Sequence, residues 1–266
     1  MNQVDSEKNQ VIDTTAEFYD RLSADYDIMT HFAKRFVHEK PFFNMLVQKY
    51  GIETALDAGC GTGFHSLLLG ELGVKVTAVD VSKQMLEHLK IHAREAHAKI
   101  ELLESSFQEL PDRLHRTFDA VFCLGNSLPH LLTQHELIQS LKNFSSALNP
   151  GGLLLLQQLN YDRILAKKER IQSVKEADGV TFIRFYEFHK ASVVFNILTL
   201  KKENGQTRHE LESTSLRPIL KGDLLNALKA AGFSDIRLHG SIALDDYREL
   251  ESKDLVVLAR VPDAKS

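Results

Sequence analysis

Hydrophobic residues follow two different periods along the first part of the chain. Between residues 16 and 50 they recur at helical spacing, as at Phe32, Phe36 and Phe43, which predicts two helices that end at Gly51. From residue 55 onward, short apolar runs alternate with amphipathic stretches. We expect strands at 55–58, 74–79, 100–103, 120–124 and 153–158, and helices at 66–72, 83–96 and 135–148. This alternation is typical of βαβ units, in which helices cover both faces of a parallel sheet.

The pattern changes after Asn160. Before it, Pro150-Gly151-Gly152 predicts a turn that leads into a fully apolar strand, which is suited to the centre of a sheet. After it, three β-rich runs joined by short polar turns predict an antiparallel meander at 180–188, 192–201 and 206–217. A helix is expected next, with Asp223 as its N-cap and Gly232 as its end, followed by two closing strands near 236 and at 255–259.

These patterns together predict an α/β fold with a doubly wound, mostly parallel sheet. Residues 1–50 are expected to form a helical lid within the same domain, and residues 51–160 the ligand-binding core. Residues 161–218 are expected to form the antiparallel β insertion, and residues 219–266 to complete the core sheet. The carboxyl ends of the parallel strands are where open α/β sheets bind ligands.

Composition narrows the class of protein. The chain has 266 residues, of which 43% are hydrophobic and 26% charged, so disordered, collagen-like and disulfide-scaffold classes are excluded. Its formal net charge of -4 does not favour nucleic acid as a partner. No apolar run is long enough to span a membrane, and the first ten residues are polar, so we expect a cytoplasmic protein that does not bind membranes. Cys60 and Cys123 are expected to be buried thiols.

A glycine-rich loop follows the first predicted strand and opens a helix. It consists of Asp57, Gly59, Gly61 and Gly63 at alternate positions. Glycines let the backbone approach a ligand closely, and the start of a helix presents free amide groups. Asp80 ends the next predicted strand, where a carboxylate is suited to binding a ribose diol.

The spacing of this loop distinguishes between nucleotide cofactors. A dinucleotide fingerprint needs glycine at the sixth position from Gly59, where this chain has Phe64. Asp57 also adds negative charge, which disfavours a pyrophosphate and suits a ligand with an amino group or a cationic centre. A tight turn in which Asp57 caps the helix, with no ligand, remains an alternative.

Four segments taken together resemble class I S-adenosylmethionine-dependent methyltransferases. They are the glycine-rich loop, Val76 to Asp80 with the following Ser82 to Leu86, Phe118 to Val121, and Pro150 to Gly152. The resemblance implies a seven-stranded Rossmann-like fold that binds S-adenosylmethionine. It assigns Asp57 and the loop glycines to the methionine part, and Asp80 to the ribose hydroxyls. It also implies cofactor contacts for Met85, Ser106, Phe107 and Leu124.

Two further segments resemble the glycine N-methyltransferase-like members of that class. They are 123–131 and 160–165, and Arg35 falls where that family places an arginine on the cofactor carboxylate. The resemblance implies transfer of a methyl group to a small-molecule acceptor, with an amine nitrogen favoured and S-adenosylhomocysteine as the product. The arginine with which that family binds the glycine carboxylate is replaced by Leu159 here.

His130, Asn126 and Tyr161 are the candidate catalytic residues. His130 and Asn126 follow a strand at the ligand-binding edge, where a histidine could act as a base and an amide could orient the acceptor. Proximity alone is the alternative, because alignment of the reactants can supply roughly 7–11 kcal/mol of a barrier. Side chains of the lid and the meander could close and line the acceptor pocket: Tyr19, Tyr26, Arg184, Tyr186, His189 and Arg217.

Other functions stay open at this point. A non-catalytic S-adenosylmethionine-binding protein, an O-methyltransferase acting on a small hydroxyl or carboxylate, and a nicotinamide oxidoreductase are the alternatives. His88 and His92 lie one helical turn apart but lack the glutamate of a metal motif, so we expect a solvated helix face and no metal. A homo-oligomer is compatible with the sequence.

Overall fold

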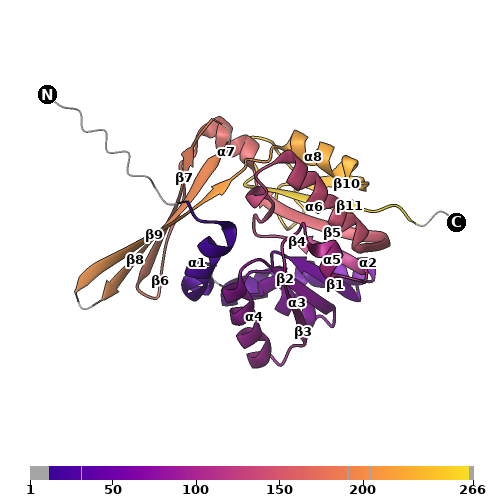
Figure 1. Ribbon diagram of the computed structural model, residues 1–266, viewed down its shortest axis with the longest axis horizontal. Helices are drawn as coiled ribbons and strands as arrows, with labels where there is room; N and C mark the ends of the chain where they lie inside the picture. The colour runs from indigo at the N-terminus through magenta and orange to yellow at the C-terminus, as the bar shows by residue number, and fades with distance from the viewer. Residues whose placement is uncertain (1–11, 31, 191, 204, 264–266) are drawn as a thin grey trace.

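The computed structural model describes residues 12–30, 32–190, 192–203 and 205–263 and contains two sheets (Figure 1). The larger sheet has seven strands in the order β10-β11-β5-β4-β1-β2-β3. The smaller sheet has four strands in the order β6-β7-β8-β9. Figure 1 shows the smaller sheet extending to one side of the core, with helix α1 (Thr15–Thr30) between them. The expected α/β class with an added antiparallel sheet is confirmed.

The centre of the large sheet is parallel, and its edge beyond β5 is antiparallel. The parallel strands are β1 (Thr54–Ala58), β2 (Lys75–Asp80), β3 (Ile100–Glu104), β4 (Phe118–Cys123) and β5 (Leu148–Leu159). Then β11 (Asp254–Arg260) pairs antiparallel with β5, and β10 (Ser234–His239) pairs antiparallel with β11. The order reverses between β1 and β4, so a crevice opens at the carboxyl ends of these strands.

Helices cover both faces of this sheet, as its apolar strands require. On one face, α2 (Phe32–Tyr50) and α3 (Phe64–Glu71) pack against side chains such as Leu155 and Phe122. On the other face, α6 (Gln134–Ser146) and α8 (Lys221–Ala230) pack against Leu154 and Val121. Adjacent leucines of β5 therefore enter different cores, because successive side chains of a strand alternate in direction. Two more helices complete this domain: α4 (Lys83–Glu95) and the short α5 (Leu110–Arg113).

Two details of the core differ from the sequence-based predictions. The turn expected at Pro150 is not a separate turn but lies inside β5. There the pairing with β4 shifts register between Phe118 and Ala120, and this irregularity accommodates the extra residues of β5. Helix α8 begins at Lys221 after Leu220, so Asp223 lies in its first turn and is not the N-cap. A negative side chain in that turn still interacts favourably with the helix dipole.

The smaller sheet contains one strand more than predicted. Its strands are β6 (Ile171–Ala177), β7 (Val180–Phe188), β8 (Val193–Glu203) and β9 (Gln206–Leu216), each antiparallel to its neighbour. Helix α7 (Tyr161–Lys167) leads from the core into this sheet. Phe18, Leu22 and Met29 of α1 pack on its face, which fixes the lid against the insertion.

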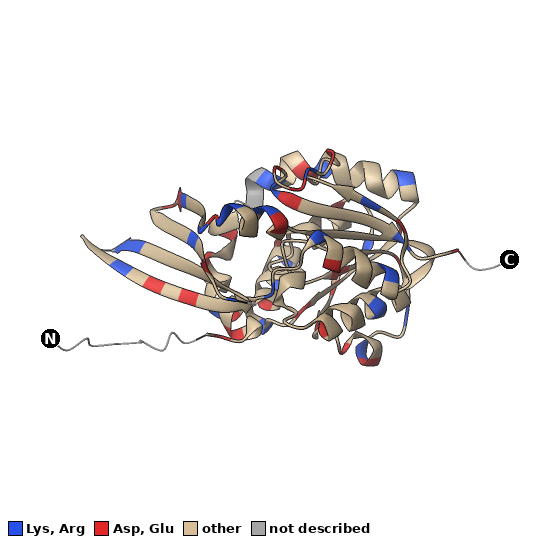
Figure 2. Ribbon diagram, turned by 90° about the horizontal axis from the view of Figure 1, so that it is seen from above, with Lys and Arg blue, Asp and Glu red and all other residues tan. Residues whose placement is uncertain are grey.

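Figure 2 shows that positively and negatively charged residues are both distributed over the helices and strands. Cys60 and Cys123 are both free and buried, as expected. In the part of the chain that the structure describes, no helix is long and apolar enough to span a membrane.

Candidate functional site

The glycine-rich loop connects β1 to α3 at the reversal point of the sheet. The Gly59 and Cys60 amides both donate to the Val79 carbonyl, at 2.8 and 3.0 Å, which holds the loop against the end of β2. Gly59 has a φ of 75° and approaches Ser127 so closely that a Cβ would lie 2.6 Å from its hydroxyl. Gly63, with a φ of 92°, stands directly before α3. The loop therefore needs glycine both for its backbone angles and for space.

Asp80 lies at the carboxyl end of β2, beside this loop. Its carboxylate accepts hydrogen bonds from the Gly61 amide and the Ser82 amide, each at 2.9 Å. Burial raises the pKa of Asp80 to about 6, against the lowering effect of those two amides. Each carboxylate oxygen keeps a lone pair available to a hydroxyl donor. This is the arrangement that a ribose diol can use.

Asp57 and Met85 lie behind the loop and do not line the cavity beside it. Asp57 is buried and accepts a hydrogen bond from the Ser66 hydroxyl at 2.6 Å, which ties β1 to α3. Met85 is buried in the first turn of α4, where its amide donates to Ser82. Their cofactor contacts remain predictions, and the structure gives both residues a supporting position.

A cavity of about 270 Å³ opens over the glycine-rich loop. The loop residues Gly59 and Gly61 form part of its wall, together with Asp80. Phe107, Leu124 and other apolar side chains provide a surface suited to a flat ring. The cavity is also lined by Ser106, Gln108, Ser127, Leu131 and Glu136.

Arg35 lines this cavity and is held in place by neighbours. Its Nε donates to Glu39 at 2.7 Å, and its guanidinium lies 4.1 Å from the centre of the Phe64 ring. His65, which also lines the cavity, contacts the same glutamate at 3.1 Å. A guanidinium fixed in this way can bind a ligand carboxylate. The donor set of the whole cavity, with amides, a carboxylate, apolar walls and this cation, fits S-adenosylmethionine.

A second cavity, of about 250 Å³, adjoins the first beneath the small sheet. The two cavities share six lining residues: Tyr19, Tyr26, Thr30, Arg35, Gly125 and His130. The second cavity is otherwise lined by Asn126, Gln157 and residues of the insertion such as Arg184 and Tyr186. A donor bound over the loop and an acceptor under the sheet would therefore meet at this shared wall.

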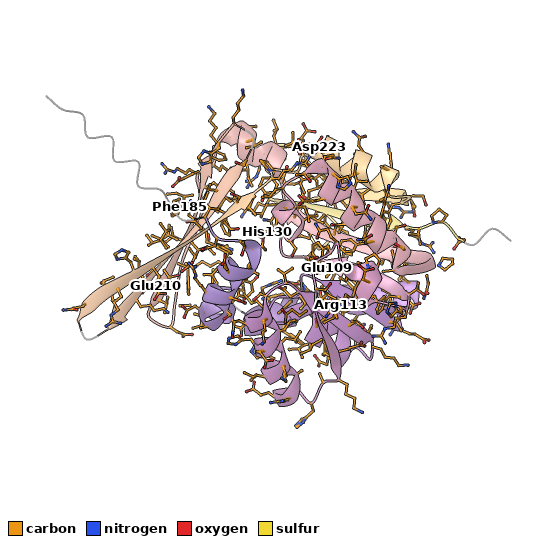
Figure 3. All side chains as sticks on the ribbon, in the orientation of Figure 1. Glu109, Arg113, His130, Phe185, Glu210 and Asp223 are labelled. Atoms are coloured by element: carbon orange, nitrogen blue, oxygen red, sulfur yellow. The ribbon has the colours of Figure 1, made fainter. Side chains whose placement is uncertain are left out.

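His130 belongs to that shared wall and lies between the core and the lid in Figure 3. Its Nε2 lies 3.0 Å from the Tyr19 hydroxyl, and its Nδ1 lies 3.3 Å from the Thr15 hydroxyl. Burial lowers the pKa of His130 to about 4, so the ring is neutral near pH 7. A neutral imidazole bonded in this way positions its neighbours well and is a weak base.

Asn126, which lines the second cavity, forms a hydrogen-bonded pair with Tyr161 behind it. The Asn126 side-chain amide donates to the Tyr161 hydroxyl at 3.0 Å, and its carbonyl accepts from the Leu159 amide at 2.9 Å. Asn126 has a φ of 70°, which is uncommon for a residue other than glycine. Tyr161 is fully buried and lies outside both cavity walls. Its hydroxyl therefore orients Asn126.

The lid carries two contacts that periodicity did not predict. Asp20 of α1 accepts hydrogen bonds from the Ser82 hydroxyl at 2.6 Å and from the Gln84 amide at 3.1 Å, at the start of α4. Asp27 accepts from the Thr62 hydroxyl at 2.5 Å and contacts His92 at 3.0 Å. His92 is therefore part of the lid contact, and the expectation of a purely solvated helix face was wrong for it. These contacts close α1 over the cofactor cavity.

Gln157 is a further site residue that sequence reasoning missed. Its side-chain carbonyl accepts from the Gly125 backbone amide at 2.8 Å, and its side-chain amide donates to the Asp254 carboxylate at 2.9 Å. The sequence did carry a signal for this residue, because Gln157 is a polar residue near the end of an otherwise apolar run at the ligand-binding edge.

Among the residues described, no group of three or more His, Cys, Asp and Glu could hold a metal ion.

The fold and the site together define a class I S-adenosylmethionine-dependent methyltransferase. A family model for a methyltransferase domain matches residues 55–152. A glycine/sarcosine N-methyltransferase from Halorhodospira halochloris is 32% identical over 249 residues, which is 88% of this chain and 91% of the relative. Its counterpart from Aphanothece halophytica is 34% identical over 251 residues, 90% of this chain and 86% of the relative.

A solved S-adenosylmethionine-dependent methyltransferase from Clostridium acetobutylicum has the same fold. It covers 92% of this chain and 99% of its own, with a TM-score of 0.79 at 18% identity. The chain thus belongs to the methyltransferase family that includes the glycine/sarcosine N-methyltransferases, and it is an enzyme that uses S-adenosylmethionine. The nicotinamide alternative is set aside.

Proposed function

We propose that this enzyme transfers a methyl group from S-adenosylmethionine to an amine nitrogen of a small molecule and releases S-adenosylhomocysteine. One observation carries the proposal: two cavities, one over the glycine-rich loop and one under the small sheet, share a wall at His130, Gly125 and Tyr19. Relatives whose names specify N-methylation of glycine and sarcosine support the choice of an amine.

The cofactor is held by groups at the carboxyl edge of the sheet. Asp80 would accept from the ribose hydroxyls, Phe107 and Leu124 would contact the adenine, and Arg35 would bind the carboxylate of the methionine part. Gly59, Gly61 and Gly63 keep the loop low enough for the ligand to lie on it. When bound, S-adenosylmethionine supplies an electrophilic methyl group on its sulfonium.

The acceptor nitrogen must arrive as a neutral amine with its lone pair directed at that methyl group. The lid and the small sheet exclude water and hold the acceptor in place. Alignment of the acceptor with the methyl group therefore supplies the main part of the rate enhancement. His130 and Asn126 position the acceptor and the lid. The amine loses its proton to solvent before transfer, because a histidine with a pKa of about 4 is a poor base near pH 7.

Release of S-adenosylhomocysteine tests this function. Purified enzyme and S-adenosylmethionine are incubated with separate pools of amino acids, other amines, phenols and carboxylic acids, and calorimetry measures cofactor binding in parallel. We expect tight cofactor binding and turnover in an amine-containing pool. Binding without turnover in any pool would contradict the proposal and favour a non-catalytic binder. Turnover confined to phenols or carboxylic acids would establish an O-methyltransferase.

A further inference from the structure

Arg184 occupies an unusual position for a charged residue, in the middle of an apolar stripe on β7. Phe182 and Tyr186, two residues before and after it, share its face of the sheet and are buried. Its register partner on β8, Ile197, is buried as well. Burial lowers the pKa of the Arg184 guanidinium, which still stays charged at any ordinary pH. A cation in such surroundings loses hydration and is stabilised by an anion nearby.

The protein itself satisfies Arg184 incompletely. Its Nε donates to the Ser173 hydroxyl of the neighbouring strand at 2.7 Å, which fixes one edge of the guanidinium. Among the side chains that the structure describes, no Asp or Glu forms an ion pair with Arg184. Its two terminal nitrogens have no acceptor there either. These nitrogens are the pair of donors that matches the two oxygens of a carboxylate.

The cavity that Arg184 lines carries an excess of positive charge. Arg35 is the other cation on its wall and already pairs with Glu39 at 2.7 Å. No acidic side chain of the described residues belongs to this wall. Tyr186 is not a source of negative charge, because burial raises its pKa to about 12. A purely cationic acceptor would meet Arg184 without a counter-ion, whereas an anionic group would be attracted.

We propose that Arg184 forms a carboxylate-binding subsite in the acceptor cavity, so that the acceptor is an amine that also carries a carboxylate. This rests on the proposed function. The planar guanidinium binds the two carboxylate oxygens side by side and directs the amine toward the shared wall at His130. Figure 3 labels His130 and Phe185, the residue that follows Arg184 in β7.

Two other residues do not serve as this subsite. Leu159 lines the same cavity as an apolar side chain and supplies no charge. Arg217 lies outside the cavity wall, where its Nη2 donates to Gln134 at 2.5 Å and lies 3.8 Å from Asp223. The inserted sheet, and not the end of β5, therefore provides the cation in this chain.

Matched acceptors test the subsite directly. We compare kcat/KM for glycine with glycinamide and for sarcosine with sarcosinamide, each expressed per neutral amine. The carboxylates are expected to be better acceptors by about 100-fold, because a site built for a charged hydrogen bond rejects an analogue that lacks it. In Arg184→Met the carboxylates should lose about 100-fold while the amides change less than about threefold. Arg184→Lys should recover part of the loss, since it keeps the charge without the fork.

Arg170→Met is the control, because the Arg170 side chain is 66% exposed and belongs to neither cavity wall. Equal turnover of amides and carboxylates by the unchanged enzyme would overturn the subsite and leave the transferase function standing.

A binding measurement tests the subsite in the case where the enzyme does not methylate amines. Methoxyacetate, which has no basic nitrogen, should bind the enzyme saturated with S-adenosylhomocysteine and should fail to bind Arg184→Met. That result without any amine turnover would support the subsite and contradict the proposed function.

Discussion

Asp80 is the residue to which we assign the ribose hydroxyls of the cofactor. Replacing it with Asn should weaken S-adenosylmethionine binding roughly 10- to 100-fold, because hydrogen bonds to a charged group contribute about 1.5–3 kcal/mol. Calorimetry measures the dissociation constant. Glu104→Gln is the matched control, since Glu104 is the exposed acid beside Asp80 on β3 and lines neither cavity. Equal affinities for both variants would show that Asp80 does not bind the ribose.

The raised pKa of Asp80 gives cofactor binding a pH dependence of known sign. Below about pH 6 the carboxyl group is protonated and becomes a poorer acceptor for two hydroxyls, so affinity should fall with falling pH. The effect of this group on the stability of the free enzyme is opposite. Its pKa in the unfolded chain lies near 3.8, so the folded state binds the proton more tightly and gains stability as the pH falls from about 6 toward 4. Calorimetry and thermal melts across this range would detect the two trends, and an affinity independent of pH would contradict the assignment.

His130 should contribute through position and not through proton transfer. The variant His130→Asn is expected to lower kcat about tenfold, which is less than the 10²- to 10⁴-fold typical of a general base. The pH profile of kcat/KM should show no ionisation near 6.5 that disappears in the variant, because the pKa of His130 is about 4. A loss of a thousandfold together with a changed acidic limb would establish His130 as a base.

At the scale of elements, we predict that helix α1 controls access to the cofactor. Asp20→Ala removes its two hydrogen bonds to the start of α4, where a negative group is also favoured by the helix dipole. We expect S-adenosylmethionine to dissociate roughly tenfold faster, since the lid loses a charged contact. Stopped-flow displacement measures this rate. Glu17→Gln on the same helix is the control, because Glu17 is exposed and its carboxylate accepts hydrogen bonds from the Thr14 amide and hydroxyl. Similar dissociation rates for the two variants would rule out a gating role for this contact.

Periodicity predicted most elements because their apolar residues are also their buried ones. It missed β6, an edge strand in which Ile171 and Val174 are more than 60% exposed, so no hydrophobic pattern marks it. Sequence reasoning placed the start of α8 at Asp223, because aspartate is a preferred N-cap residue. The helix in fact begins after Leu220, and no local sequence signal marks that start.

Part of the site was predictable because some of its residues form local sequence patterns. Glycines and acids at strand ends predict a ligand-binding loop from the sequence alone. The resemblance to glycine N-methyltransferase-like enzymes identified Arg35 as a candidate. The contacts of Asp20, Asp27 and His92 depend on how the lid packs across the core, so no local pattern marks them. The burial that makes His130 a weak base is likewise a property of the folded chain.

For the whole molecule, the central claim is that the core supplies the methyl donor and the small sheet supplies the acceptor, with transfer at the wall between them. The most direct test uses S-adenosylmethionine labelled with ¹³C in its methyl group and glycine or sarcosine as acceptor, followed by NMR. We predict a labelled methyl group bonded to nitrogen in the product, formed at a rate that depends on Arg184. A label found on oxygen, or label that stays on the cofactor while both ligands are bound, would contradict it.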